Sequence, residues 1–293
     1  MNVISPGPSR ASYHTLARGM RCLRSYRIAQ EIEKELGSSA TSNQTKPMQQ
    51  GSLVHVGLAH VYLYLWADEL ALRTRAGHKI LIANEELTDP TEYAPWQRAV
   101  YDSAADFDLS GEEVSEIVST LRTYEVQVAR TDKHQFDLIS IENEYEYYLK
   151  GVPEGKELRT QRADLVLYER RTGKYFIVDH KKVWRLSNIT EEQFLPHGQF
   201  IGYSIIGRKL YGSAFGGVIL NRVCLQGPRF DRTIINHSKE VIMAFIASMK
   251  ETLWRLDAYK DKSWRETPGV FDEQVCKGKY ESCPFMKMCI GIK

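Results

Sequence analysis

The sequence lacks a long apolar run, a strong net charge and a paired set of cysteines, and each absence excludes a class of protein. No run of about 18 apolar residues occurs, which excludes an ordinary membrane-spanning helix. The formal net charge of +2 excludes a basic field over the whole surface, so a nucleic-acid site would be a local groove of Lys and Arg. Five cysteines, an odd number, argue against a closed disulfide framework.

The N-terminal segment also lacks the apolar core of a secretory signal. Several arginines precede its first acidic residue, Glu31, as in a transit peptide: Arg10, Arg18, Arg21, Arg24 and Arg27. A basic arm or a first helix of the fold is the alternative. The polar Ser, Thr, Asn and Gln stretch 37–51 predicts an exposed loop.

The segment 162–182 has the pattern of a β-hairpin. Two apolar runs, 165–168 and 175–178, flank a polar loop that ends in Gly173. A hairpin centred in this loop places Asp164 opposite Asp179.

Two aspartates and a lysine gather at one end of this hairpin. Side chains alternate along a strand, so Asp179 and Lys181 share a face and His180 points away. Opposed carboxylates repel each other, and a divalent cation offsets that repulsion. Oxygen ligands of this kind suit Mg²⁺ or Mn²⁺. A solvated strand end is the alternative, because Asp-x-Lys is a common tripeptide.

The order of helices and strands indicates an α/β or α+β fold around a central mixed sheet flanked by helices. The pattern Ser110-Gly-Glu-Glu predicts a capped helix that runs to about Val128. Apolar residues at helical spacing predict another helix after Ser238, and residues 218–225 predict a late strand. At 293 residues, with 43% hydrophobic content, the chain can bury a substantial core.

Asp164 and the Asp179-His180-Lys181 tripeptide resemble the PD-(D/E)XK nuclease superfamily in its RecB-type branch. The stretch 141–147 resembles the strand that precedes the hairpin in that branch. One departure is Lys182, where that branch often has Thr. The resemblance implies a restriction-endonuclease-like core.

The same resemblance implies roles for three further residues. His55 lies in a Gly-x-x-x-His context on an early helix, where the branch has a histidine that reaches the metal. Gln199 and Tyr203 have the i, i+4 spacing of the Gln-x-x-x-Tyr motif, whose helix contacts the site and the DNA. We expect Tyr203 to stack on a base and Gln199 to hold the substrate or the site, with Glu191, Glu192 and Pro196 in the first turn of their helix.

Three cysteines close to one another near the C-terminus, Cys276, Cys283 and Cys289, indicate a metal centre. Their uneven spacing, with Cys283 followed by Pro, suits an iron–sulfur cluster better than zinc, which usually shows Cys-x-x-Cys pairs. Cys22 is the candidate fourth ligand, while Cys224 sits in an apolar strand and is expected in the core. Unligated surface or core thiols are the alternative.

This cysteine pattern resembles the iron–sulfur nucleases of the RecB-type branch, such as the AddB nuclease domain and the CRISPR-associated and phage exonucleases. There, one N-terminal and three C-terminal cysteines hold a [4Fe–4S] cluster that joins the two ends of the chain. A ligand at Cys22 favours the basic N-terminus as part of the fold. We therefore expect one nuclease domain over 1–293. Its parts would be a mainly helical 28–135, a nuclease core 136–225 and a cluster region formed by 10–27 and 265–293.

The resemblance implies a metal-dependent deoxyribonuclease, an exonuclease acting on single-stranded DNA or DNA ends. Its catalytic residues would be Asp164, Asp179 and Lys181, and its metal ligands His55, Asp164, Asp179 and the backbone carbonyl of His180. Lys181 would orient the attacking water and stabilise the transition state. The partner is DNA, without a membrane. The expected location is the reducing cytoplasm, and a phage or organellar origin stays open. The alternatives are a non-catalytic DNA-binding scaffold with this fold and a zinc-containing interaction protein.

Overall fold

A computed structural model describes residues 2–4, 13–36, 45–186, 191–277 and 283–291 of the chain. The chain divides into two compact units. The first comprises Met1–Ser9, Thr45–Tyr145 and Gln161–Ser238, and the second comprises Arg10–Gln44, Glu146–Thr160 and Lys239–Lys293. The organisation as a single nuclease domain stays a prediction.

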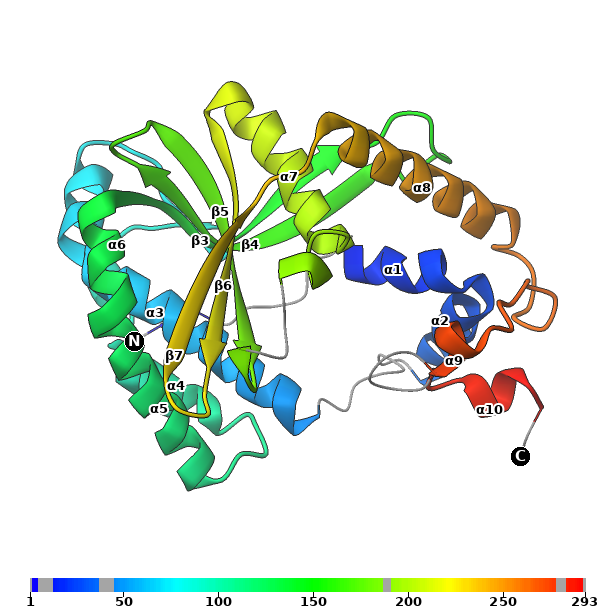
Figure 1. Ribbon diagram of the computed structural model, residues 1–293, viewed down its shortest axis with the longest axis horizontal. Coiled ribbons are helices and arrows are strands. Elements are labelled where there is room, and N and C mark those ends of the chain that lie inside the picture. The colour runs from blue at the N-terminus through cyan, green and yellow to red at the C-terminus, as the bar shows by residue number, and fades with distance from the viewer. Residues whose placement is uncertain (1, 5–12, 37–44, 187–190, 278–282, 292–293) are drawn as a thin grey trace. The chain divides into compact units, whose positions relative to one another are not determined.

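A seven-stranded mixed sheet forms the centre of the first unit, with the strand order β2-β1-β3-β4-β5-β6-β7 (Figure 1). The strands are β1 (Leu81–Ile82), β2 (Glu85–Glu86), β3 (Phe136–Tyr148), β4 (Leu158–Glu169), β5 (Lys174–Val183), β6 (Phe215–Cys224) and β7 (Arg229–Ile235). β1 pairs with β3, and β5 with β6, in parallel. The pairs β1–β2, β4–β5 and β6–β7 are antiparallel. The predicted mixed sheet is confirmed.

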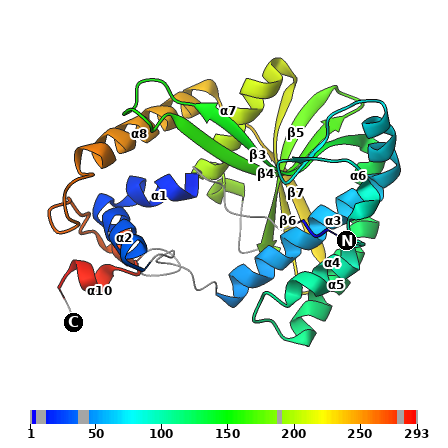
Figure 2. The ribbon, with the colours of Figure 1, turned by 180° about the vertical axis from the view of Figure 1, so that it is seen from behind.

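Helices cover the two faces of this sheet, which confirms the α+β class (Figures 1 and 2). One face carries α3 (Lys46–Arg75), α4 (Trp96–Ala104), α5 (Gly111–Tyr124) and α6 (Arg130–Gln135), and the other carries α7 (Gly198–Tyr211). A π-helical turn, Glu125–Ala129, joins α5 to α6. Short 3-10 turns lie at Pro90–Glu92, Glu191–Gln193 and Gly212–Ala214. Strand residues Leu165, Leu167 and Val178 share one buried core with Leu58, Tyr62 and Trp66 of α3.

The predicted hairpin is present in the predicted register. β4 and β5 pair Leu165 with Val178 and Tyr168 with Tyr175. The recorded pairs run as far as Leu165 and Val178. Just beyond them, Asp164 contacts His55 of α3 whereas Asp179 contacts Tyr203 of α7, so the two aspartates, expected to face each other, point to opposite faces of the sheet.

The predicted helix at Ser110 and the helix after Ser238 are confirmed as α5 and as α8 (Lys239–Ala258). At the start of α5, Glu113 N donates to Ser110 Oγ at 3.2 Å and Ser110 N donates to Glu113 Oε2 at 2.8 Å, which is the predicted capping box. The late strand is confirmed as β6.

Two helix starts differ from prediction. The expected loop 37–51 is wrong over its last residues, because α3 already begins at Lys46, with Pro47 in its first turn; residues 37–44 lie outside the described residues. The helix of Gln199 begins at Gly198, after the N-cap His197, and not at Glu191–Pro196. A 3-10 turn occupies Glu191–Gln193 instead.

The second unit contains α1 (Tyr13–Arg21), α2 (Leu23–Leu36), α8, α9 (Glu273–Lys277) and α10 (Met286–Cys289). Within it, the side chain of Arg24 donates to the carbonyl oxygen of Thr267 at 2.8 Å. Ile28 of α2 packs in a small core with Trp264 and Phe285. No helix within the described ranges is long and apolar enough to cross a bilayer.

Candidate metal centre

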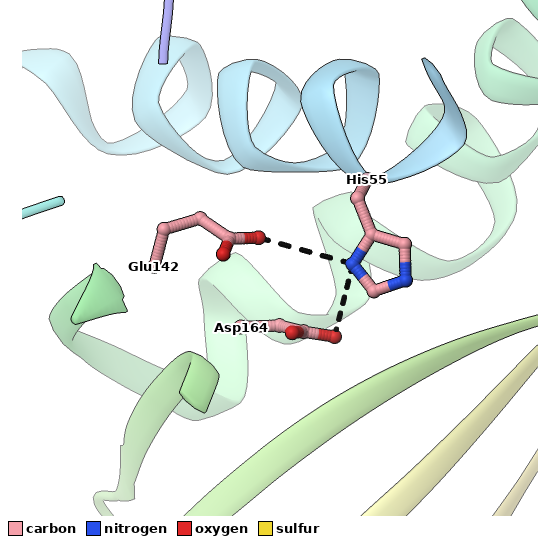
Figure 3. A group of neighbouring side chains, drawn as sticks. All are labelled: His55, Glu142 and Asp164. Carbon is pink, nitrogen blue, oxygen red and sulfur yellow. Dashed lines mark ion pairs between the residues drawn. The ribbon is translucent and has the colours of Figure 1, made fainter. Parts of the chain in front are cut away.

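Three side chains from three elements of the first unit meet in a compact group of nitrogen and oxygen atoms (Figure 3). His55 comes from α3, Glu142 from β3 and Asp164 from β4. One potential ligand atom from each lies within 4.8 Å of those of the other two. His55 Nδ1 lies 3.3 Å from Asp164 Oδ2 and 3.8 Å from Glu142 Oε1. Both carboxylates are buried, whereas the imidazole is 23% exposed, which leaves an approach from solvent.

Glu142 was not predicted as a site residue. It lies inside β3 with φ +48°, a left-handed backbone conformation that a residue with a side chain rarely adopts. Such conformations cluster at functional sites, where the surrounding structure holds them in place. The only signal in the sequence was an acid within the 141–147 stretch that resembles the strand before the hairpin.

Four further predicted residues form a closed ring of polar contacts. Lys181 Nζ lies 2.6 Å from Asp179 Oδ2 and donates to Gln199 Oε1 at 3.2 Å. Gln199 Nε2 donates to the Tyr203 hydroxyl at 3.0 Å, and that hydroxyl donates to Asp179 Oδ1 at 2.9 Å. Asp179 and Lys181 therefore share a face of β5, as predicted, and Gln199 and Tyr203 share the facing side of α7.

The ring of Tyr203 is only 1% exposed. A base cannot stack on a ring that is covered by the protein, so the structure corrects the expectation of stacking. The Tyr203 hydroxyl instead contacts Asp179 Oδ1 and, at 2.8 Å, the carbonyl oxygen of Arg162. The residue thus holds Asp179 and the neighbouring strand in place.

His180 connects the two groups. Its backbone N–H donates to Asp164 Oδ2 at 2.6 Å. Its buried ring points away from Lys181, as predicted, and lies 6.2 Å from the ring of His55 between centroids. Asp164 contacts His55 of α3, while Asp179 contacts Tyr203 of α7. The predicted set of His55, Asp164, Asp179 and His180 is assembled in two adjoining parts rather than as one shell.

The protonation of the buried groups depends on their neighbours. Burial raises the pKa of Glu142 to about 7, with the Asp164 carboxylate adding to the effect. Burial also raises the pKa of Asp179, although Lys181 opposes that change. Burial alone would raise the pKa of Asp164 and lower that of His55; their mutual attraction outweighs it, so the pKa of Asp164 falls and that of His55 rises. Burial lowers the pKa of His180 to about 3, so its ring is neutral at physiological pH.

The donor set fits a divalent cation. It offers carboxylate oxygens and one imidazole nitrogen, a combination that suits Mn²⁺ as well as Mg²⁺. Burial and the Asp164 carboxylate both raise the pKa of Glu142, and a bound cation would oppose these effects.

The four predicted cluster cysteines lie in the second unit around one cavity of about 250 Å³. Cys22, Cys276, Cys283 and Cys289 all line it, beside apolar residues such as Ile28 and Phe285. None of the four is in a disulfide. Cys224 is fully buried in β6, as predicted, and is not among them.

The family model of the PD-(D/E)XK nuclease superfamily matches residues 10–290. No curated protein matches the sequence. Among solved structures, the crystal structure of SSO0001 is similar at 12% identity and a TM-score of 0.30, over 78% of this chain and 84% of that chain.

Proposed function

This chain belongs to the PD-(D/E)XK nuclease superfamily, and from that premise we propose that its buried cluster is the metal centre of a deoxyribonuclease. Membership of the superfamily implies a nuclease, a hydrolase of phosphodiester bonds in DNA that uses divalent metal ions. The observation that carries the proposal is the meeting of His55, Glu142 and Asp164 beside the Asp179–Lys181 pair.

His55, Glu142 and Asp164 would hold Mg²⁺ or Mn²⁺, with Asp179 and the backbone carbonyl of His180 as the remaining protein ligands. When bound, the cation lowers the pKa of a water molecule and offsets negative charge on the phosphate. Asp164 is kept in place for this by the backbone N–H of His180.

Lys181 is the cation of the protein that faces the reaction. Its ammonium lies between Asp179 Oδ2 and Gln199 Oε1, and 28% of the Lys181 side chain is exposed. We infer that it orients the attacking water and stabilises the charge that develops on the phosphate. Gln199 and Tyr203 would hold Lys181 and Asp179 in position.

Exonuclease action on single strands or DNA ends is part of the proposal and is supported by the Gln199–Tyr203 pair of the RecB-type branch. A second support is Trp184, which lies just beyond the Asp-x-Lys strand and is 57% exposed. The Lys182 ammonium lies 5.8 Å from its ring. An exposed ring beside a cation is the combination that binds single-stranded nucleic acid by stacking and by phosphate contact.

We also propose that Cys22, Cys276, Cys283 and Cys289 bind a [4Fe–4S] cluster. The shared cavity supports this. Thiolate ligands require reduced cysteines, so we propose a reducing compartment.

A non-catalytic scaffold is the less favoured function. A domain kept only for binding would be expected to lose at least one of Asp164, Asp179 and Lys181, and this chain keeps all three. The arrangement of Lys181 on Asp179 is also what an active site requires.

The test is digestion of single-stranded and double-stranded DNA labelled at the 5′ or 3′ end, with Mn²⁺, Mg²⁺ or EDTA. We expect metal-dependent cutting that is lost in Lys181→Ala, with product ladders that give the polarity. An iron-containing, folded wild type that cuts nothing would support the scaffold. Equal cutting by Lys181→Ala would place the active site elsewhere.

A further inference from the structure

A buried polar network links the centre of the first unit to His180, and the proposed mechanism does not use it. At one end of the network, Asp132 in α6 and Arg232 in β7 form an ion pair. Arg232 Nη1 donates to Asp132 Oδ1 and Arg232 Nη2 donates to Asp132 Oδ2, each at 2.7 Å. Arg232 Nη2 also lies 2.8 Å from the Tyr62 hydroxyl and 2.6 Å from that of Tyr124. The Tyr62 hydroxyl donates to Asp132 as well.

The contacts of Asp132 and Arg232 with Tyr62 hold the helix that carries His55. Tyr62 lies on α3 seven positions, about two helical turns, after His55, so both side chains lie on the same face of the helix. The contacts of Tyr62 with Arg232 thus help to set the distance between α3 and the sheet. That distance decides whether His55 reaches Asp164.

The network continues from Arg232 to the Asp-x-Lys strand. Arg232 Nε donates to Asn221 Oδ1 at 2.9 Å. Because an arginine nitrogen can only donate, the amide oxygen of Asn221 must face Arg232, and its NH₂ group must face His180. Asn221 Nδ2 lies 2.7 Å from His180 Nδ1, which is therefore the acceptor.

This contact determines which nitrogen of the His180 ring carries the proton. With Nδ1 as acceptor in a neutral ring, the proton is on Nε2. His180 is 1% exposed, and its Nε2 has no hydrogen-bond partner among the residues that the structure describes. A buried donor without a partner costs about 1–3 kcal/mol, so we expect the Nε2–H of His180 to donate a hydrogen bond to a molecule bound in the site.

We propose that Arg232 and Asn221 are positioning residues of the metal site, which hold the His180 ring in one orientation and one tautomer. Through the backbone N–H of His180 they also hold the Asp164 carboxylate. This inference rests on the proposed function, and it assigns residues far from the cluster in sequence to its geometry.

The decisive variant is Asn221→Asp. Its carboxylate can still accept from Arg232 and has the same size, but it cannot donate to His180. In wild-type protein labelled with ¹⁵N-histidine and free of metal, we expect an imidazole spectrum with the His180 proton on Nε2; the signal is assigned by its loss in His180→Gln. In Asn221→Asp we expect a proton on Nδ1.

Kinetics and metal binding give the functional readout. We expect Asn221→Asp to lower kcat and Mn²⁺ affinity by about 10- to 100-fold, the usual effect of removing a partner that orients a metal ligand. KM for DNA and the melting temperature should stay close to wild type. Asp231→Asn is the matched control, because it removes the neighbouring ion pair between Arg222 of β6 and Asp231 of β7 and leaves the His180 network intact.

Three results would overturn the inference: a His180 proton on Nδ1 in wild type, unchanged kcat and Mn²⁺ affinity in Asn221→Asp, or the same losses in Asp231→Asn. If Asn221→Asp does not fold, Asn221→Ser replaces it. The serine hydroxyl can both donate and accept, so we expect mixed tautomers. If wild type cuts no DNA, the proposed nuclease function fails, and the tautomer and Mn²⁺ affinity still decide this inference.

Discussion

The backbone N–H of His180 donates to Asp164 Oδ2 at 2.6 Å, so the middle residue of the Asp-x-Lys strand holds the carboxylate of the neighbouring strand. The two aspartates of the hairpin consequently have different surroundings. Asp164 faces His55, whereas Asp179 faces Lys181 and Tyr203. One hairpin thereby supplies a carboxylate to the group around His55 and a carboxylate to Lys181.

Lys181→Met tests the second of these arrangements. The substitution keeps the length of the side chain and removes the ammonium from a carboxylate that is 0% exposed. We expect the free energy of unfolding at neutral pH to fall by about 1–3 kcal/mol, because Asp179 loses a partner. DNA cleavage should fall by at least about 100-fold, the usual effect of losing a group that stabilises transition-state charge.

Lys174→Met is the control for this variant. Lys174 begins the same strand, where its ammonium contacts the carbonyl oxygen of Ser213 at 2.7 Å. Lys174→Met should cleave DNA at a rate close to that of wild type. Urea unfolding and single-turnover cleavage measure the two effects, and equal behaviour of both lysine variants would contradict the assignment.

Glu142→Gln should separate stability from metal binding. The pKa of Glu142 is raised to about 7, so above that pH the folded metal-free protein contains an ionised, buried carboxylate. Removing it should stabilise the metal-free protein at pH 8 by about 1–3 kcal/mol. Mn²⁺ affinity should fall by at least about tenfold, since a ligand is lost.

Unfolding in EDTA and calorimetric titration with Mn²⁺ measure the two opposite effects of Glu142→Gln. Glu112→Gln, on the exposed side of α5, is the control and should change neither. If Glu142→Gln binds Mn²⁺ as tightly as wild type, Glu142 is not a ligand.

Metal binding should depend on pH in a defined direction. The pKa values of Glu142 and His55 are both raised, so below about pH 7 both groups carry protons in the metal-free protein. A cation must displace these protons. We expect affinity for Mn²⁺ to increase as pH rises through 7, with more protons released per ion at pH 6 than at pH 8. Calorimetry in buffers of different ionisation enthalpy measures that release, and an affinity independent of pH would exclude these ligands.

The cysteines allow a matched comparison. Cys283→Ser should lose iron, acid-labile sulfide and brown colour, because it removes one of the four thiols around the cavity. Cys224→Ser should keep all three, because Cys224 is a core residue whose thiol contacts the carbonyl oxygen of Trp184. Metal analysis of both variants checks this, and zinc without iron in the wild type would favour a zinc site.

Local pattern was enough to predict the hairpin. Alternating side chains, two apolar runs and a loop ending in Gly173 correctly predicted the register of β4 and β5. The capping box at Ser110 was equally local and is confirmed. The hairpin and the capping box depend on residues that are close together in the chain, so their patterns can be read from one sequence.

Residues held by distant contacts could not be predicted in this way. Glu142 enters the site because its backbone is left-handed within a strand, and no local pattern shows that. The start of α3 resembled a polar loop, but Gln50 in its first turns accepts from Lys182 at 2.8 Å and donates to Glu113 at 3.1 Å. Arg232 meets Asp132 across 100 residues.

The measurement that tests the central claim most directly is anomalous diffraction from crystals of the protein soaked in Mn²⁺. We predict one strong manganese peak within bonding distance of His55, Glu142 and Asp164, and its loss in Glu142→Gln. Manganese bound elsewhere, with these three side chains still paired to one another, would contradict the account.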